Sequence, residues 1–307
     1  MTTKPVLSEE QQEIHLIAHN VLENRWPVLL EGETGIGKNF ILDWIGKELE
    51  LDVVRVNLSL NTTVEDLWGQ QLLRSTGTGT ETYFSSGPAL QAAEHGQLLL
   101  LDEVNAALPE VLFSLHGLLE VGKTELYVPQ LKRTIQVHRN FRISATMNPS
   151  EDYVGTRDLN QAFLSRFILL QMPTLSHKSI ALIMESLFPS LKSKNVLQIV
   201  DLCVQVEAFL NKEGSMYKVS VRDAMKIAQL FISIKSLSKA ANIVFSSVLK
   251  RFPEMVLQIP ELKDEVLFNH INIDDMINMY RNINSVAKWL KDDAPTVVQV
   301  IDSIKQR

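Results

Sequence analysis

The stretch EGETGIGKNF, residues 31–40, decides the fold of this chain. It follows a short apolar run and leads into Phe40–Leu49, where apolar residues recur at helical spacing. From Gly32 to Lys38 it has the G-x-x-x-x-G-K spacing of a loop that holds phosphate groups between a strand and a helix. The next residue is usually Ser or Thr, whose hydroxyl binds magnesium, and here it is Asn39. The stretch predicts a nucleotide-binding α/β core with an unusual residue at the metal position.

The glycines of this loop have a physical purpose. Without Cβ atoms, they let successive backbone N–H groups approach phosphate oxygens. The start of the following helix adds a positive dipole end, and the Lys38 ammonium reaches the terminal phosphates. We expect the whole loop to bind the nucleotide through these residues: Gly32, Glu33, Thr34, Gly35, Ile36, Gly37, Lys38, Asn39 and Phe40.

The composition is that of an ordinary globular protein. The chain has 307 residues, of which 45% are hydrophobic and 21% charged, which is enough for about two domains. Its net charge of −6 argues against a general nucleic-acid coat. The single cysteine, Cys203, excludes an internal disulfide framework, and its apolar neighbours favour a core thiol. The sequence shows no signal-peptide core and no apolar run of about 20 residues, so we expect a cytoplasmic protein without a membrane span.

Strand-like and helix-like segments alternate in the first half of the chain. A helix is expected over Ser8–Asn24, which begins with a capping box formed by Ser8 and Gln11. Five short apolar segments are expected to be strands: 27–30, 53–57, 97–101, 141–146 and 167–171. Strands separated by helices predict a parallel sheet flanked by helices, the α/β class.

Two segments interrupt this alternation. Thr76–Ser86 is rich in glycine and threonine and is expected to be a hairpin or exposed loop between a helix and a strand. Val121–Val137 alternates apolar and polar residues around Pro129 and Gln130, which predicts a second hairpin. Loops this elaborate are usually functional.

The character of the chain changes after residue 173. Glycine almost disappears, and Asn195–Asn211 and Arg222–Leu237 show 3.6-residue periodicity. We therefore predict a boundary near 173–176, with an α/β core over 1–173 and an all-helical domain over 174–307.

Carboxylates and an amide follow two of the predicted strands. LLLLDE places Asp102 at the end of a buried strand, where it is expected to hold magnesium, and Glu103 beside it can polarise a water for attack on the γ-phosphate. In FRISATMNP, Thr146 and Asn148 occupy the tip of another strand, and the Asn148 amide can orient the same water. An isolated DE or NP pair is common; together with the loop, these residues indicate hydrolysis.

Two arginines complete the candidate site. Arg166 ends a short predicted helix in DLNQAFLSRF, from which it can reach a neighbouring subunit's nucleotide. Arg222 begins a helix in the second domain, where a cation is unfavourable for the helix dipole, so another use is expected. In isolation, a surface ion pair and a solvated side chain are the better explanations of these arginines, but their order and spacing relative to the loop and to Asp102 and Glu103 favour the functional interpretation.

This ordered set resembles the AAA+ ATPases, and is most similar to their MoxR and midasin/dynein-related branch, over about residues 10–230. GETGIGKN resembles the family's Walker A motif, LLLLDEVNAA its Walker B, ATMNP its sensor 1, LNQAFLSRF its arginine-finger segment and SVRDA its sensor 2. Within residues 83–120, the most branch-specific stretch, Gly87-Pro88, Asn105 and Leu118-Leu119-Glu120 resemble the family's GP, DEIN and LLE patterns.

The resemblance implies ATP and magnesium as cofactors, with one set of residues around the phosphates, the metal and the attacking water: Gly35, Gly37, Lys38, Asp102, Glu103 and Asn148. It further implies that Arg166 is a finger acting on a neighbouring subunit, that Arg157 is a second candidate for that role, and that Arg222 is the sensor of a helical lid. It implies an α/β core with that lid, usually assembled as a hexameric ring, whose two hairpins are the helix-2 insert and the hairpin before sensor 1.

Three functions remain open at this level. The first is an ATP-hydrolysing remodeller of MoxR type, which matures or activates a protein complex, often with a von Willebrand A-domain partner. The second is an assembly scaffold that binds ATP and hardly hydrolyses it, with Asn39 as the lesion. The third is a nucleic-acid-coupled motor of McrB type, disfavoured by the acidic charge although Lys132, Arg133, His138 and Arg139 are locally basic. The amide oxygen of Asn39 is a legitimate magnesium ligand, so we favour the first.

Overall fold

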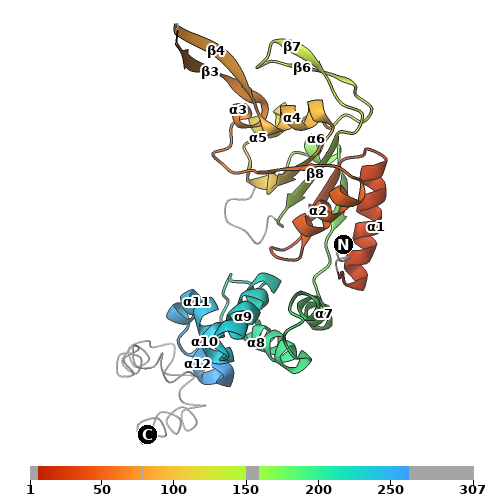
Figure 1. The fold of residues 1–307 in the computed structure, drawn as a ribbon. Coiled ribbons are helices and arrows are strands. Elements are labelled where there is room, and N and C mark those ends of the chain that lie inside the picture. Colours follow the sequence, from red (N-terminus) through yellow and green to blue (C-terminus); the bar gives the residue numbers. More distant parts are fainter. Residues whose placement is uncertain (1–5, 78, 150–158, 263–307) are drawn as a thin grey trace, which may run out of the picture. The chain divides into compact units, whose positions relative to one another are not determined.

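A parallel sheet forms the centre of the first half of the protein, as predicted. The computed structural model describes residues 6–77, 79–149 and 159–262 (Figure 1). The sheet has the strand order β2-β5-β8-β1-β9, and all its neighbouring strands pair in parallel. Its strands are β1 (Val28–Glu31), β2 (Val53–Asn57), β5 (Leu98–Asp102), β8 (Arg142–Met147) and β9 (Ile168–Gln171). Each predicted strand lies within one residue of the observed one, so the α/β fold is confirmed.

The sheet is covered on both faces. Leu98 and Leu100 of β5 belong to one buried cluster, with α1 (Glu9–Glu23) and α2 (Lys38–Glu48). Leu99 and Leu101 belong to another, which includes residues of α4 (Pro88–His95) and α5 (Pro109–Ser114). Side chains alternate between the faces of a strand, so a fully apolar strand is stable only when both faces are buried.

Helix α1 begins as the sequence predicted. The Ser8 side chain accepts a hydrogen bond from the Gln11 backbone, and the Gln11 side chain accepts one from Ser8. This capping box satisfies backbone donors that the first turn leaves free. Helix α2 begins at Lys38, two residues before the predicted start, because the loop glycine Gly37 directly precedes it as its N-cap.

The first hairpin is longer than predicted. It consists of β3 (Gly69–Thr76) and β4 (Gly79–Ser86), and it connects α3 (Val64–Trp68) to α4. The prediction over Thr76–Ser86 therefore found only the second strand, and it was wrong in placing the insertion between a helix and a strand. The first strand, β3, was not predicted, because its adjacent residues Leu72 and Leu73 are both exposed and give no period-2 pattern.

The second hairpin matches its prediction. It consists of β6 (Glu125–Val128) and β7 (Arg133–Gln136), and the turn between them begins at Pro129. Figure 1 shows both hairpins extending away from the five-stranded sheet. A short turn over Val104–Ala106 and α6 (Gln161–Leu164) complete the described elements around the sheet.

The chain is helical from Ser176 to Leu262 apart from its turns. Its helices are α7 (His177–Leu187), α8 (Ser193–Lys212), α9 (Val221–Ile234), α10 (Leu237–Val244), α11 (Ser246–Arg251) and α12 (Met255–Gln258), followed by a 3-10 turn over Pro260–Leu262. The predicted helix to residue 237 was too long, because Lys235 adopts a left-handed φ of 60° and Ser236 caps the next helix. No helix in the described ranges is both long and apolar enough to cross a membrane.

Contacts divide the chain into two compact units. One contains residues up to Val196 together with Met216–Arg222, and the other contains Leu197–Ser215 and the residues from Asp223 onward. Cys203 lies in the second unit, where burial raises the pKa of its thiol to about 12. The cysteine is thus a core thiol, as predicted, whereas the domain boundary at 173–176 stays a prediction.

Candidate functional site

The loop between β1 and α2 has the backbone of a phosphate-binding loop. Gly35 and Gly37 have φ angles of 88° and 94°, a left-handed conformation that glycine adopts without steric cost. A Cβ at Gly35 would lie 3.1 Å from the Cβ of Ser220, and one at Gly37 would lie 3.3 Å from Nε2 of Gln11. The loop is therefore closely packed as well as glycine-dependent.

Gln11 supports the loop from α1. Its side chain is almost fully buried, and Nε2 donates a hydrogen bond of 2.9 Å to the backbone oxygen of Ile36. The same side chain forms the capping box of α1. Sequence reasoning found the cap and missed this second contact, which joins positions 25 residues apart.

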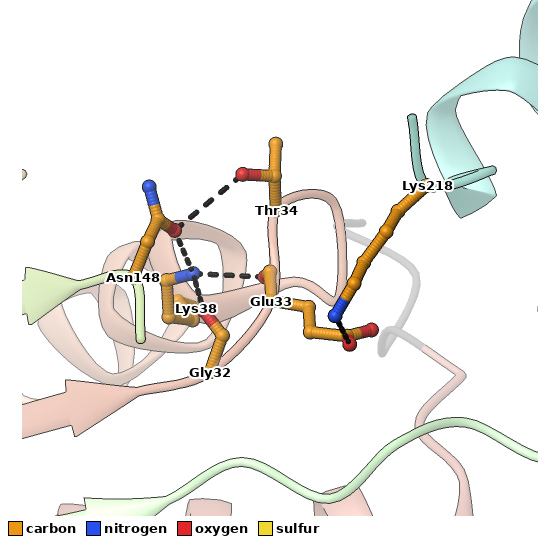
Figure 2. A network of polar contacts seen from close by, with 6 residues as sticks. All are labelled: Gly32, Glu33, Thr34, Lys38, Asn148 and Lys218. Carbon is orange, nitrogen blue, oxygen red and sulfur yellow. Dashed lines mark hydrogen bonds and ion pairs between the residues drawn. The ribbon is translucent and has the colours of Figure 1, made fainter. Parts of the chain in front are cut away.

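The Lys38 ammonium is fully engaged (Figure 2). Nζ donates to the backbone oxygen of Gly32 at 2.5 Å, to that of Glu33 at 2.9 Å and to Oδ1 of Asn148 at 2.9 Å. These three acceptors match the three donors of an ammonium. Burial of this side chain lowers its pKa from 10.5 to about 8, although the Asp102 and Glu103 carboxylates act in the opposite direction. Lys38 is thus held by its own loop and by the tip of β8.

Asp102 joins the ends of two strands and the start of α2. Its Oδ1 accepts a hydrogen bond of 2.5 Å from the Thr146 hydroxyl, and its Oδ2 accepts one of 2.5 Å from Nδ2 of Asn39. The carboxyl ends of the parallel strands β5 and β8 lie at one edge of the sheet, which is why these groups meet. The structure therefore brings together Asn39 and Asp102, the two predicted metal ligands.

The residues present fit a magnesium ion. Oδ1 of Asn39 is buried and has no hydrogen-bond partner in the described ranges, and an amide oxygen is a hard ligand of the kind magnesium prefers. Among the residues that the structure describes, no group of three or more His, Cys, Asp or Glu forms a metal site. A magnesium ion beside Asn39 and Asp102 would accordingly take its remaining ligands from phosphate oxygens and water, as it does in nucleotide sites.

Glu103 adopts a strained backbone conformation. Its φ and ψ are 58° and 47°, a left-handed geometry that is uncommon outside glycine. Its backbone N–H donates to the Thr146 hydroxyl at 3.4 Å. The side chain is exposed and makes no hydrogen bond or ion pair with the described residues, so its carboxylate is available as a base.

Asn148 is held at two points. Its side-chain oxygen accepts from Lys38, with the Thr34 hydroxyl 3.5 Å away, and its backbone oxygen accepts a hydrogen bond of 2.8 Å from Nδ2 of Asn105. The predicted amide therefore lies beside the phosphate-binding loop. The contact with Asn105 was not anticipated.

The three predicted arginines differ in their surroundings. Arg166 follows α6, its Nη1 donates to the backbone oxygen of Ala162, and its charge helps burial to lower the pKa of His116. Arg222 is near enough for its charge to lower the pKa of Lys38 further. Arg157 lies outside the described residues.

An ion pair ties the segment before α9 to the loop. Nζ of Lys218 lies 3.0 Å from Oε1 of Glu33 (Figure 2), and Ser220 faces Gly35. The segment 216–222 and the loop belong to the same compact unit. The sequence contains no signal for this pair, which joins residues 185 positions apart.

Comparisons with known proteins identify the family of the domain that contains this loop. Residues 27–167 match the family model of the AAA domain, dynein-related subfamily. Midasin of Dictyostelium discoideum is 30% identical over 211 residues, which are 67% of this chain and 4% of midasin. An uncharacterized protein of Staphylococcus epidermidis is 33% identical over 146 residues, 47% of this chain and 54% of that protein. The chain thus spans a small part of midasin and about half of the staphylococcal relative.

A solved structure shows the same fold. NtrX from Brucella abortus in complex with ADP has a TM-score of 0.50 at 14% identity, over 74% of this chain and 51% of that one. At this identity the likeness concerns the fold alone. The family match covers the loop, Asp102 and Asn148 together, and the chain belongs to the AAA+ ATPases, with a dynein-related AAA domain at residues 27–167.

Proposed function

We propose that this chain binds ATP with magnesium and hydrolyses it, and that it acts as an oligomeric remodeller of MoxR type on a partner protein complex. The observation that carries the proposal is the hydrogen-bonded Lys38 ammonium, which joins the phosphate-binding loop to Asn148. A lysine so placed has only to exchange oxygen acceptors when phosphate enters. The exchange costs little, because the ammonium is already removed from bulk water.

The other residues divide the remaining work. Backbone N–H groups of the loop bind phosphate oxygens, and Asn39 and Asp102 would hold magnesium, which neutralises charge on the β- and γ-phosphates when bound. Glu103 takes the proton of the attacking water, and the Asn148 amide orients that water. Arg222 would contact the γ-phosphate from the segment that Lys218 holds to the loop.

Magnesium-dependent release of phosphate from ATP tests the proposal. Lys38→Ala removes the phosphate contact, and Glu103→Gln removes the base while keeping the shape of the side chain. We expect each to lower turnover by a factor of about 10² or more, with Glu103→Gln alone retaining ATP binding. Wild-type turnover no higher than that of these two variants would contradict the proposal.

The same assay decides the alternative of an ATP-binding scaffold. One observation favours that alternative: the metal position presents an amide nitrogen to Asp102 where a hydroxyl is usual. A scaffold would bind ATP and magnesium in the wild type with no turnover above background.

The assembly is part of the proposal. Arg166 lies beside His116, and its described contacts include none with the loop that holds Lys38. A catalytic finger at this position acts on a neighbouring subunit's nucleotide, with Arg157 as the other candidate. This favours a ring, which is hexameric in keeping with the family resemblance. The client, reached directly or through a von Willebrand A-domain partner, is then a protein complex in the cytoplasm, and nucleic acid is not the expected partner.

A further inference from the structure

Asn105 joins the two residues that we expect to handle the attacking water. It lies in the short turn directly after Glu103, its side chain is 2% exposed, and its Nδ2 donates to the backbone oxygen of Asn148 at 2.8 Å. We propose that Asn105 is a positioning residue for hydrolysis, which fixes the backbone of Asn148 relative to the Glu103 turn. The inference rests on the proposed ATPase function and assigns a role within the same site.

Pairing of β8 with β1 reaches Met147, next to Asn148, but it does not join Asn148 to the Glu103 turn. The ladder between β5 and β8 ends at the pair Leu101 and Ala145, so Glu103 and Asn148 lie beyond its last backbone pairing. Past that point, side chains make the connections between the two strand ends. Thr146 bonds to Asp102 and lies near the Glu103 backbone, while Asn105 bonds to Asn148 itself.

The bond from Asn105 reaches the backbone of Asn148 and leaves its side chain free to change partner. The Lys38 ammonium holds that side chain in the present arrangement. To contact phosphate, the ammonium must release at least one of its three acceptors. When Asn148 loses this bond, the Asn105 contact still fixes its backbone. The amide of Asn148 can then turn toward water about a fixed position.

Stability alone does not explain Asn105. Its Oδ1 is buried and has no partner in the part of the chain that the structure describes, and an unpaired buried acceptor lowers stability. The side chain therefore contributes through its Nδ2 donor. In an ATPase, this donor holds Glu103 and Asn148 at a fixed relative position.

The chain offers a matched control in its second unit. Asn242 of α10 is 3% exposed, and its Nδ2 donates to the backbone oxygen of Leu262 at 3.0 Å. Asn105→Ala and Asn242→Ala therefore remove the same kind of bond from equally buried sites. Only the first removes it from the candidate site.

Three measurements on the full chain test the inference: kcat, the Kd for a fluorescent ATP analogue with magnesium, and backbone hydrogen exchange over residues 142–149. For Asn105→Ala we expect kcat to fall by about a hundredfold, because displacement of a positioning group by an ångström has this effect, with Kd nearly unchanged and faster exchange at the tip of β8. For Asn242→Ala, kcat and exchange over this segment stay at wild-type values.

Specific outcomes overturn the inference. Unchanged kcat in Asn105→Ala, or kcat and Kd that worsen together with thermal stability, would mean a merely structural asparagine. Asn105→Leu has nearly the same shape without a donor or a charge, and makes the same comparison should the alanine variant not fold. If the wild type itself shows no turnover, the proposed function fails, and exchange over 142–149 still decides: equal exchange in the Asn105 and Asn242 variants would refute the positioning role.

Discussion

The buried Lys38 ammonium makes ATP affinity sensitive to alkaline pH. Burial lowers its pKa to about 8, and only the protonated form attracts phosphate. Between pH 7.5 and 9.5 the protonated fraction falls from about three quarters to about 3%, so we expect the Kd for ATP to rise by about twentyfold. A lysine with the ordinary value of 10.5 would lose only about a tenth of its charge over this range.

The effect on stability has the opposite sign. Between pH 8 and 10.5 the unfolded chain keeps the Lys38 proton and the folded chain releases it. Stability rises with pH wherever the unfolded state binds more protons, so this group favours folding as pH increases through that window. A loss of affinity at pH 9.5 therefore does not arise from unfolding driven by Lys38.

The assay is a titration of ATP and magnesium by calorimetry at pH 7.5, 8.5 and 9.5. Lys38→Arg is the control, because a guanidinium stays protonated throughout this range. We expect the variant to bind more weakly and with a flat pH profile. A flat profile in the wild type would refute the inferred pKa, and an equal fall in Lys38→Arg would assign the effect to another group.

Two further predictions concern the metal and the neighbouring subunit. Asn39→Thr places a hydroxyl beside Asp102, and we expect the magnesium concentration for half-maximal turnover to fall severalfold; an unchanged requirement would mean that the position is indifferent. Arg166→Ala and Glu103→Gln should each be inactive alone and regain phosphate release when their subunits are mixed, because one shared site then has both an intact base and an intact finger. No recovery in mixed oligomers would argue against a finger acting between subunits.

The sheet was predictable because its strands are short apolar runs between breaks. Leu98–Leu101 reads as a buried strand in any context, since four consecutive leucines require both faces to be covered. The first strand of the β3–β4 hairpin was not predictable on these grounds, because its exposed leucines have no core to face. The end of α9 depends on the left-handed Lys235, for which the sequence has no marker comparable to glycine.

The candidate site also has a part that the sequence predicts and a part that it does not. Lys38, Asp102 and Asn148 follow from local motifs, each of which fixes its residue at the end of a strand or the start of a helix. The contacts that hold those motifs together, from Gln11 to the loop and from Asn105 to Asn148, join positions 25 and 43 residues apart. Their donors are ordinary polar side chains, and only the folded chain shows which acceptor each one meets.

The role of Asn39 can be inferred only when the local motif and the folded structure are considered together. A hydroxyl at this position would donate to Asp102 and offer its oxygen to magnesium through one atom. In Asn39 the nitrogen donates to Asp102, and the buried, unpaired oxygen is left for the metal. The two roles are both present, and separate atoms of one amide carry them. The substitution should therefore act on magnesium affinity and geometry, while the phosphate contacts of Lys38 and the loop glycines stay as they are.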